Sequence, residues 1–282
     1  MRSTTAVGWL LAAGAFALAL AVLKASVEAQ ASTELFTSMR EDGYHLVTDG
    51  VALGKEPGLA AYFAGFTPAD AAARGTAVST ARADYLSCVV SRAPQKVLAM
   101  LASDVEEART RLAGSRFGPI VWKFAILQDR AENGWPHTHG GVVCLPLRHF
   151  ASSSNDRVRT LVHEAVHVWQ RANPEQARSL ILGCEPLGPA RDLLPHPYRR
   201  LLRSNPDLDG LLWTCSESDG LAAAQIFDTQ APESLAESSA MLFAHEEGKV
   251  KPVGYAASGC EGCEHPWETM AYSVAQSLVP SP

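Results

Sequence analysis

The segment TLVHEAVHVWQ, residues 160–170, contains the pattern His-Glu-x-x-His at His163, Glu164 and His167. On a helix that turns about 100° per residue, its apolar side chains fall within an arc of roughly 160°, and both histidines lie near the middle of the opposite face. Imidazoles at positions i and i+4 lie about 5–6 Å apart at Cβ, so they can converge on one Zn²⁺. The pattern predicts a helix with one anchoring face and one face that lines a cleft, where Glu164 lies beside the metal without binding it.

The composition of the chain makes a chance occurrence of this pattern rare. With 9 His and 18 Glu among 282 residues, about 0.02 occurrences are expected. The alternative interpretation is an amphipathic surface helix whose two histidines are solvated. The Glu at the second position and the separation of apolar and polar faces favour the metal site.

The stretch VHEAVHVWQ, residues 162–170, resembles the active-site helix of the zincin superfamily of zinc metallopeptidases. The resemblance implies an α+β fold with a small twisted mixed sheet, whose edge strand lies above the active-site helix and pairs with an extended peptide substrate. It also implies a Zn²⁺ cofactor, hydrolysis of a peptide bond, and Glu164 as the general base. The apolar strand 142–146, which follows Gly140 and Gly141, is placed for the edge-strand role, and an ordinary core strand is the alternative.

A catalytic zinc normally has three protein ligands, so a third ligand is expected outside the helix. In gluzincins, a branch of the zincins, that ligand is a Glu on a later helix, and Glu268 in the segment 265–278 matches this role. Pro266 is expected at the first helical position, which puts Glu268 in the first turn and Tyr272 on the same face. The alternative role for Glu268 is to complement the helix dipole.

Other third ligands stay open. The metzincin pattern requires Gly at position 170 and His at position 173, where this chain has Gln170 and Asn173, so that branch is excluded. The remaining candidates are Asp207, Asp209, Asp219, His196 and His245, and Glu261, Glu264 and His265 lie close to Glu268 in the sequence.

Amide hydrolysis also needs a donor for the developing oxyanion besides the metal. The candidates for this contact, or for contacts with the substrate, are Tyr272, His137, His139 and His196. The run His137-Thr138-His139 has two further interpretations, a second metal site and a solvated loop. The solvated loop is the default expectation for it.

Periodicity and turn residues predict the order of the elements along the chain. Helical sequence is expected from Thr67-Pro68 to Leu112, most clearly over residues 95–112. Strands are expected at residues 120–127 and 142–145 with a polar loop between them, and helices at residues 155–171, from Asn173-Pro174 and from Pro266. Residues 185–220 are expected to form loops with short helices and residues 221–259 a helix with a hairpin around Glu247-Gly248, so the C-terminal part is predicted to be mainly helical.

Residues 6–23 are 18 consecutive apolar residues. This length lies between the core of a signal peptide, about 7–15 residues, and a membrane span of about 20. A small-x-small pattern ending at Ala29 favours cleavage, whereas Lys24 favours an uncleaved membrane tether. We expect residues 1–29 to be a signal peptide or signal anchor, and residues 30–282 to form one exported zincin-like domain with two lobes flanking a cleft.

The chain contains six cysteines, an even number that predicts disulfides in an exported protein, with 15 possible pairings. Cys260-x-x-Cys263 has no second C-x-x-C to complete a zinc ribbon. A disulfide or a redox pair is therefore expected there rather than a second metal.

The expected partner is a peptide or protein substrate. The net charge of −6 provides no basic field for phosphate binding, so nucleic acid is not expected to bind. A function of a different class stays open, a catalytically inactive zinc-binding domain used for adhesion or ligand capture. A hydrolase acting on a non-peptide amide is a third interpretation.

Overall fold

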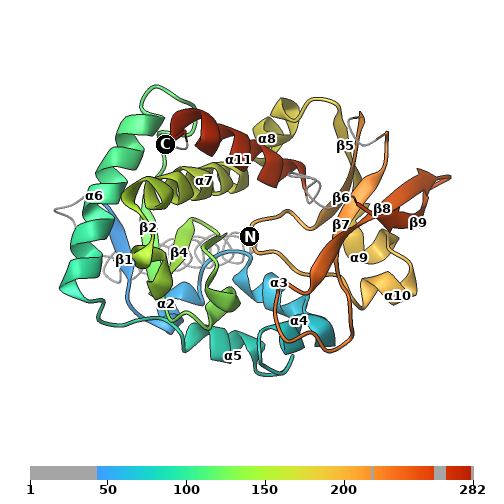
Figure 1. Ribbon diagram of the computed structural model, residues 1–282, viewed down its shortest axis with the longest axis horizontal. Coiled ribbons are helices and arrows are strands. Elements are labelled where there is room, and N and C mark those ends of the chain that lie inside the picture. The colour runs from blue at the N-terminus through green and yellow to red at the C-terminus, as the bar shows by residue number, and fades with distance from the viewer. Residues whose placement is uncertain (1–42, 217–218, 257–264, 281–282) are drawn as a thin grey trace, which may run out of the picture. The chain divides into compact units, whose positions relative to one another are not determined.

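The computed structural model describes residues 43–216, 219–256 and 265–280. The chain forms two compact units, residues 1–46 and 47–282, and all the described helices belong to the second unit (Figure 1). The expected leader, with its apolar run, lies outside the described residues. Among the helices that are described, none is long and apolar enough to span a membrane.

The second unit is a mixed α+β structure with two sheets. Its α-helices are α2 (Gly50–Leu53), α3 (Leu59–Ala64), α4 (Pro68–Ala73), α5 (Ala81–Leu86), α6 (Gln95–Leu112), α7 (Ser154–Ala172), α8 (Pro174–Leu180), α9 (Ala190–Leu193), α10 (His196–Arg199) and α11 (Pro266–Leu278), and its 3-10 helices are η1 (Ala131–Gly134) and η2 (Leu147–Ala151). Its strands are β2 (Lys123–Leu127), β3 (His137–His139), β4 (Val142–Pro146), β5 (Cys184–Pro189), β6 (Leu211–Cys215), β7 (Ala222–Phe227), β8 (Ser238–Glu246) and β9 (Lys249–Tyr255), and the short strand β1 (His45–Val47) spans the boundary between the units.

Helix α7, which carries the His-Glu-x-x-His pattern, begins and ends at residues whose local chemistry favours a helix terminus. The Ser153 side chain accepts a hydrogen bond from the backbone N–H of Asp156, which caps the first turn. Pro174 follows the last turn and starts α8, because proline is compatible with a first helical position. The predicted helix at residues 155–171 is therefore confirmed, with one additional residue at each end.

The apolar face of α7 is buried in the core, as its periodicity predicts. Helix α7 packs against both α6 and α11 (Figure 1). A buried ion pair joins α7 to α6, since Arg157 Nε donates to Asp104 Oδ2 at 2.6 Å and Arg157 Nη2 donates to Asp104 Oδ1 at 3.1 Å. These contacts fix the position of α7 relative to its two neighbouring helices.

Strand β4 corrects the expectation that residues 142–146 form the edge of the sheet. It lies between β2, to which it is parallel, and β3, to which it is antiparallel. All five of its residues are buried. A continuous apolar run is typical of a strand covered on both faces, so this strand is core and β3 lies at the end of the sheet.

The segment His137-Thr138-His139 corrects the expectation of a solvated loop. It forms β3, and its three side chains are buried. His139 lies among aromatic rings, with centroids 5.1 Å from Tyr62 and 5.3 Å from Tyr85. The polar residue types of this strand do not indicate burial in the sequence. Its burial depends on aromatic residues from helices that are far away in the chain.

The predicted mainly helical C-terminal part is wrong for residues 184–255. These residues form an antiparallel sheet in the order β5-β6-β7-β8-β9, with the short helices α9 and α10 between β5 and β6 (Figure 1). The alanine-rich start of β7 is helix-prone by itself, but it alternates buried and half-buried residues and packs with Leu194 and Phe243 in one core. The hairpin at Glu247-Gly248 is confirmed, with both residues at positive φ.

One disulfide is present among the described cysteines. Cys184 and Cys215 lie opposite each other on β5 and β6 and are bonded. Cys88 and Cys144 are buried free thiols, and Cys260 and Cys263 lie outside the described residues.

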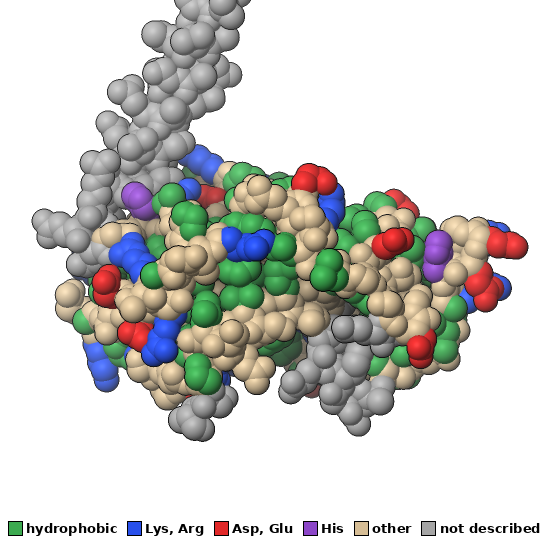
Figure 2. All heavy atoms as spheres, turned by 90° about the horizontal axis from the view of Figure 1, so that it is seen from above, with side chains coloured by type: hydrophobic (Ala, Val, Ile, Leu, Met, Phe, Trp, Pro, Cys, Tyr) green, Lys and Arg blue, Asp and Glu red, His purple; other side chains and the backbone are tan. Residues whose placement is uncertain are grey.

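On the face drawn in Figure 2, the described Lys and Arg side chains lie among Asp and Glu side chains and form no continuous basic surface.

The buried imidazole of His149, in η2, makes a prediction about stability. Burial lowers the pKa of His149 to about 4; Asp104 opposes this shift and Arg157 adds to it. Between about pH 6.5 and about pH 4 the unfolded chain therefore binds more protons at this residue than the folded chain does. The free energy of unfolding should decrease by up to about 1.4 kcal/mol per pH unit as the pH falls through this range.

The variant His149→Asn removes the titrating group, so its stability should depend less on pH over the same range. Urea unfolding of the wild-type chain and this variant at several pH values measures the difference. Equal slopes in the two proteins would show that His149 does not carry this pH dependence.

Candidate metal centre

Helices α7 and α11 bring three donor atoms together. His163 Nε2 and His167 Nε2 are 3.0 Å apart, and Glu268 Oε2 lies 3.3 Å from the first and 3.4 Å from the second. Among the described residues, His163, His167 and Glu268 are the cluster of metal-binding side-chain types whose donor atoms all lie within 4.8 Å of one another, close enough to hold one metal ion. Glu268, the residue that the sequence predicts as the third ligand, thus lies beside both histidines, although 101 residues separate it from His167.

The size of this triangle fits zinc. Ligand atoms about 2.0–2.1 Å from a tetrahedral Zn²⁺ lie about 3.3 Å from one another, which is close to the three distances observed. His167 is fully buried and Glu268 is nearly so. Buried donor atoms at such distances need a cation or a proton between them, because their lone pairs would otherwise face one another without water.

The tautomer of His167 follows from its neighbour Gln170. The carbonyl oxygen of Trp267 can only accept a hydrogen bond, so Gln170 Nε2 is the atom that donates to it, at 3.1 Å. Gln170 Oε1 then faces His167 Nδ1 at 2.9 Å and accepts its proton. His167 Nδ1 therefore carries a proton, and Nε2, which is directed at the cluster, is the atom that would bind a metal in exchange for its own proton.

The start of α11 sets the position of Glu268. His265 caps the helix, since its Nδ1 accepts from the backbone N–H of Trp267 at 3.2 Å, and Pro266 is the first helical residue. His265 Nε2 donates to Asp209 Oδ1 at 3.1 Å. His265 is thus a capping residue and is not part of the metal cluster, and Glu268 lies in the first turn as predicted.

The charges in the cluster agree with an ionised Glu268. Although burial opposes it, the charge of His167 and hydrogen bonds from both imidazoles hold the pKa of Glu268 well below its usual value. Burial by itself lowers the pKa of His167. The charge of Glu268 and its hydrogen bond have the larger combined effect and raise the pKa of His167 to about 9. The negative field that stabilises a proton on His167 would equally stabilise a divalent cation between the three donors.

Glu164 lies beside this cluster and lines the same cleft. Its side chain is 3% exposed, and its Oε2 has no hydrogen-bond partner. Burial raises the pKa of Glu164 well above its usual value; the carboxylate of Asp207 adds to this rise, and His167 opposes it. A buried carboxylate with an unused oxygen and a raised proton affinity is suited to accept a proton.

A cleft of about 900 Å³ gives access to the cluster. His163, Glu164 and Glu268 line it, together with the exposed ring of Trp135 and the segment 203–207. The guanidinium of Arg203 lies 5.2 Å from the centre of the Trp135 ring. The cleft therefore combines the candidate metal ligands with an aromatic surface and a positive charge.

The four candidates for oxyanion contact are placed differently. Tyr272 lines the cleft, is 62% exposed, and has its ring centroid 4.5 Å from that of His163. His137 also lines the cleft, but its Nδ1 donates to the carbonyl of Trp135 and its Nε2 bonds to the hydroxyl of Tyr85. His139, the last residue of β3, is buried in the core, and His196 is exposed on α10. The lining of the cleft includes neither of them.

The remaining third-ligand candidates have other roles or positions. Asp207 Oδ1 accepts from the backbone N–H of Thr138 at 2.6 Å and from its hydroxyl at 2.7 Å. Asp209 bonds to His265. Asp219 lies in a turn at positive φ and His245 lies on β8, while Glu261 and Glu264 lie outside the described residues.

Sequence reasoning missed two residues that bond to the candidate ligands. Gln170 lies three residues after His167 on the same face of α7, so its position was a usable signal. Asn205, whose Nδ2 donates to Glu268 Oε1 at 3.0 Å, lies in a loop far from both helices and has no local sequence signal.

Comparisons of the chain with protein-family models, with curated proteins and with solved structures find no match.

The bond between Gln170 and His167 predicts that Gln170 supports metal affinity. Replacing it in the variant Gln170→Leu leaves His167 Nδ1 without its acceptor, and loss of such a partner lowers metal affinity by about 10- to 100-fold. Zinc competition with a chromophoric chelator measures the change. Gln176→Leu, at an exposed position of α8, is the matched control and should leave the affinity unchanged; a folded Gln170→Leu variant with wild-type affinity would contradict the prediction.

Proposed function

We propose that this chain is a zinc-dependent peptidase of the zincin type, with His163, His167 and Glu268 as metal ligands and Glu164 as general base. One observation carries the proposal. Three donor atoms, two from buried side chains and one from the partly buried His163, form a triangle with edges of 3.0, 3.3 and 3.4 Å, and an unpaired buried carboxylate lines the same cleft. A helix with solvated histidines, the simpler interpretation of the pattern, has no need for such a triangle.

The proposed reaction is hydrolysis of an amide bond. When bound, zinc supplies a Lewis acid that polarises the scissile carbonyl and makes water more acidic. Glu164 accepts a proton from the attacking water and transfers it to the nitrogen of the leaving amine, so one water is consumed for each bond broken. Tyr272, exposed in the cleft beside His163, is the residue proposed to contact the oxyanion.

The arrangement of the first sheet supports the zincin type in part. Strand β3 is antiparallel to β4, lies at the end of the sheet, and contacts α7, which are the features expected of the edge strand above the active-site helix. The backbone N–H of Thr138 on this strand, however, already donates to Asp207. We therefore propose that substrate binds through side-chain contacts in the cleft and not through that N–H.

We also propose that the protein works outside the cytoplasm. The bonded pair Cys184–Cys215 supports this location, because disulfides form and persist in oxidising compartments. The apolar run at residues 6–23 supports export or a membrane tether.

Metal content is the first test of the proposal. The purified wild-type chain should bind one Zn²⁺, and bound zinc should raise its thermal unfolding midpoint, because a ligand that binds only the folded state stabilises it. His163→Ala removes one ligand at the rim of the cleft and should abolish both effects. Elemental analysis and thermal unfolding with and without chelator measure them. A wild-type chain that binds no zinc would remove the basis of the proposal.

Glu164→Gln tests the catalytic role separately from metal binding. The variant keeps the shape of the side chain but cannot accept the proton, so zinc content should survive while hydrolysis of a fluorogenic peptide library falls by about 10²- to 10⁴-fold. Glu175→Gln, on the exposed surface of α8, is the matched control and should retain activity. If the wild-type chain binds zinc and cleaves no peptide, the site is the inactive zinc-binding domain or acts on another amide.

A further inference from the structure

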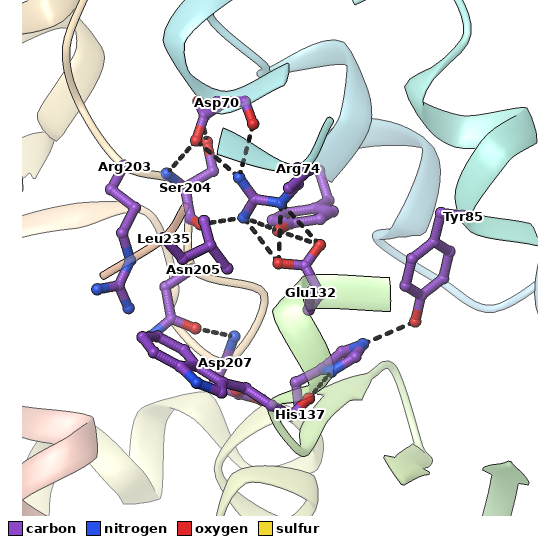
Figure 3. Close-up of polar contacts among 12 residues, drawn as sticks. Asp70, Arg74, Tyr85, Glu132, His137, Arg203, Ser204, Asn205, Asp207 and Leu235 are labelled. Carbon is purple, nitrogen blue, oxygen red and sulfur yellow. Dashed lines mark hydrogen bonds and ion pairs between the residues drawn. The ribbon is translucent and has the colours of Figure 1, made fainter. Parts of the chain in front are cut away.

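The loop between α10 and β6 contributes residues 203–207 to the lining of the cleft. Its first half is anchored to α4. The backbone N–H of Ser204 donates to Asp70 Oδ1 at 2.8 Å, and the hydroxyl of Ser204 donates to Asp70 Oδ2 at 2.9 Å. Arg74 Nη2 donates to the carbonyl of Ser204 at 2.9 Å, so three hydrogen bonds tie this one residue to α4 and to the residue that caps it (Figure 3).

The anchor itself is fully built into the core. Asp70 is completely buried and also closes the capping box of α4 with Thr67. Arg74 Nε lies 2.9 Å from both carboxylate oxygens of Glu132, which comes from η1 and is buried (Figure 3). Because an unpaired buried charge is strongly destabilising, these groups keep their partners. Ser204 therefore has a fixed position relative to the core.

The second half of the loop is anchored to β3. Asp207 Oδ1 accepts from both the backbone N–H and the hydroxyl of Thr138. The loop is thus held at both ends by buried side chains, with Asn205 between them.

Asn205 has only one possible orientation of its amide. The backbone N–H of Asp207 is a donor, so the atom it bonds to at 2.9 Å must be Asn205 Oδ1. Asn205 Nδ2 consequently faces Glu268 and donates to Glu268 Oε1 at 3.0 Å. The donor is bound to one carboxylate oxygen, while the other, Oε2, faces His163 and His167.

We infer that Asn205 is a positioning residue for the metal centre: it holds Glu268 Oε1, so that Oε2 alone is presented as the third ligand. The inference rests on the proposed metal site. A carboxylate tied in this way binds with one oxygen and keeps a fixed orientation, and outer partners of this kind support metal affinity. The loop is held to the core through Asp70 and Thr138. Asn205 therefore has a fixed position, and its hydrogen bond keeps the proposed ligand Glu268 of α11 in place.

The test compares zinc affinity in Asn205→Asp, Asn205→Ala and the wild-type chain, with the apo proteins checked for folding by thermal unfolding. Asn205→Asp preserves the shape but replaces the donor with a carboxylate next to Glu268. Its dissociation constant for Zn²⁺ should rise by about 100-fold, and that of Asn205→Ala by about 10-fold. A role limited to filling space would instead leave Asn205→Asp closer to the wild-type chain than Asn205→Ala.

Asn173→Asp is the matched control, because Asn173 Nδ2 donates to the carbonyl of Trp169 at 2.9 Å and contacts none of the proposed ligands. It should bind zinc like the wild-type chain. If the wild-type chain binds zinc and both Asn205 variants bind zinc as tightly as the wild-type chain does, the inference about Asn205 is wrong. The proposed metal centre is not contradicted by that result. If the wild-type chain binds no zinc, the metal centre fails first. The visible spectrum of bound Co²⁺ gives a second readout, which should change in the Asn205 variants and not in the control.

Discussion

The docking of α11 against α7 is the contact on which the candidate site depends. It places Glu268 Oε2 within 3.4 Å of two imidazole nitrogens that lie one helical turn apart. Three donor atoms this close together, two of them on buried side chains, repel one another unless a cation or proton lies between them. The fold thus maintains an arrangement that is costly by itself, and such an arrangement is typical of a functional site.

The hydrogen bonds that Gln170 and Asn205 make to the cluster share one feature: each occupies the outward atom of a proposed ligand. Gln170 binds the Nδ1 of His167 and Asn205 binds the Oε1 of Glu268, so Nε2 and Oε2 face inward. Gln170 also bonds to the backbone of α11 through Trp267. The same side chain therefore orients one ligand and ties together the two helices that carry all three.

The sequence predicted the elements whose order depends on local periodicity. The helix 95–112, the helix around His163 and the start of the last helix at Pro266 are as expected, because an amphipathic period and a cap are properties of neighbouring residues. The expectations failed where burial came from distant parts of the chain. Strand β3 looked polar because its aromatic cover comes from α3 and α5, and β4 looked like an edge because its neighbour β3 was unrecognised.

The sequence by itself determined the spacing of His163, Glu164 and His167 on one face, since helical geometry converts that spacing into proximity. It also singled out Glu268 through the expected first turn of a helix. Only the tertiary structure decided that Glu268 meets the histidines, that Gln170 and Asn205 bond to His167 and Glu268, and that residues 203–207 line the cleft. These contacts join segments that are distant in sequence, and their distances depend on how the whole core packs.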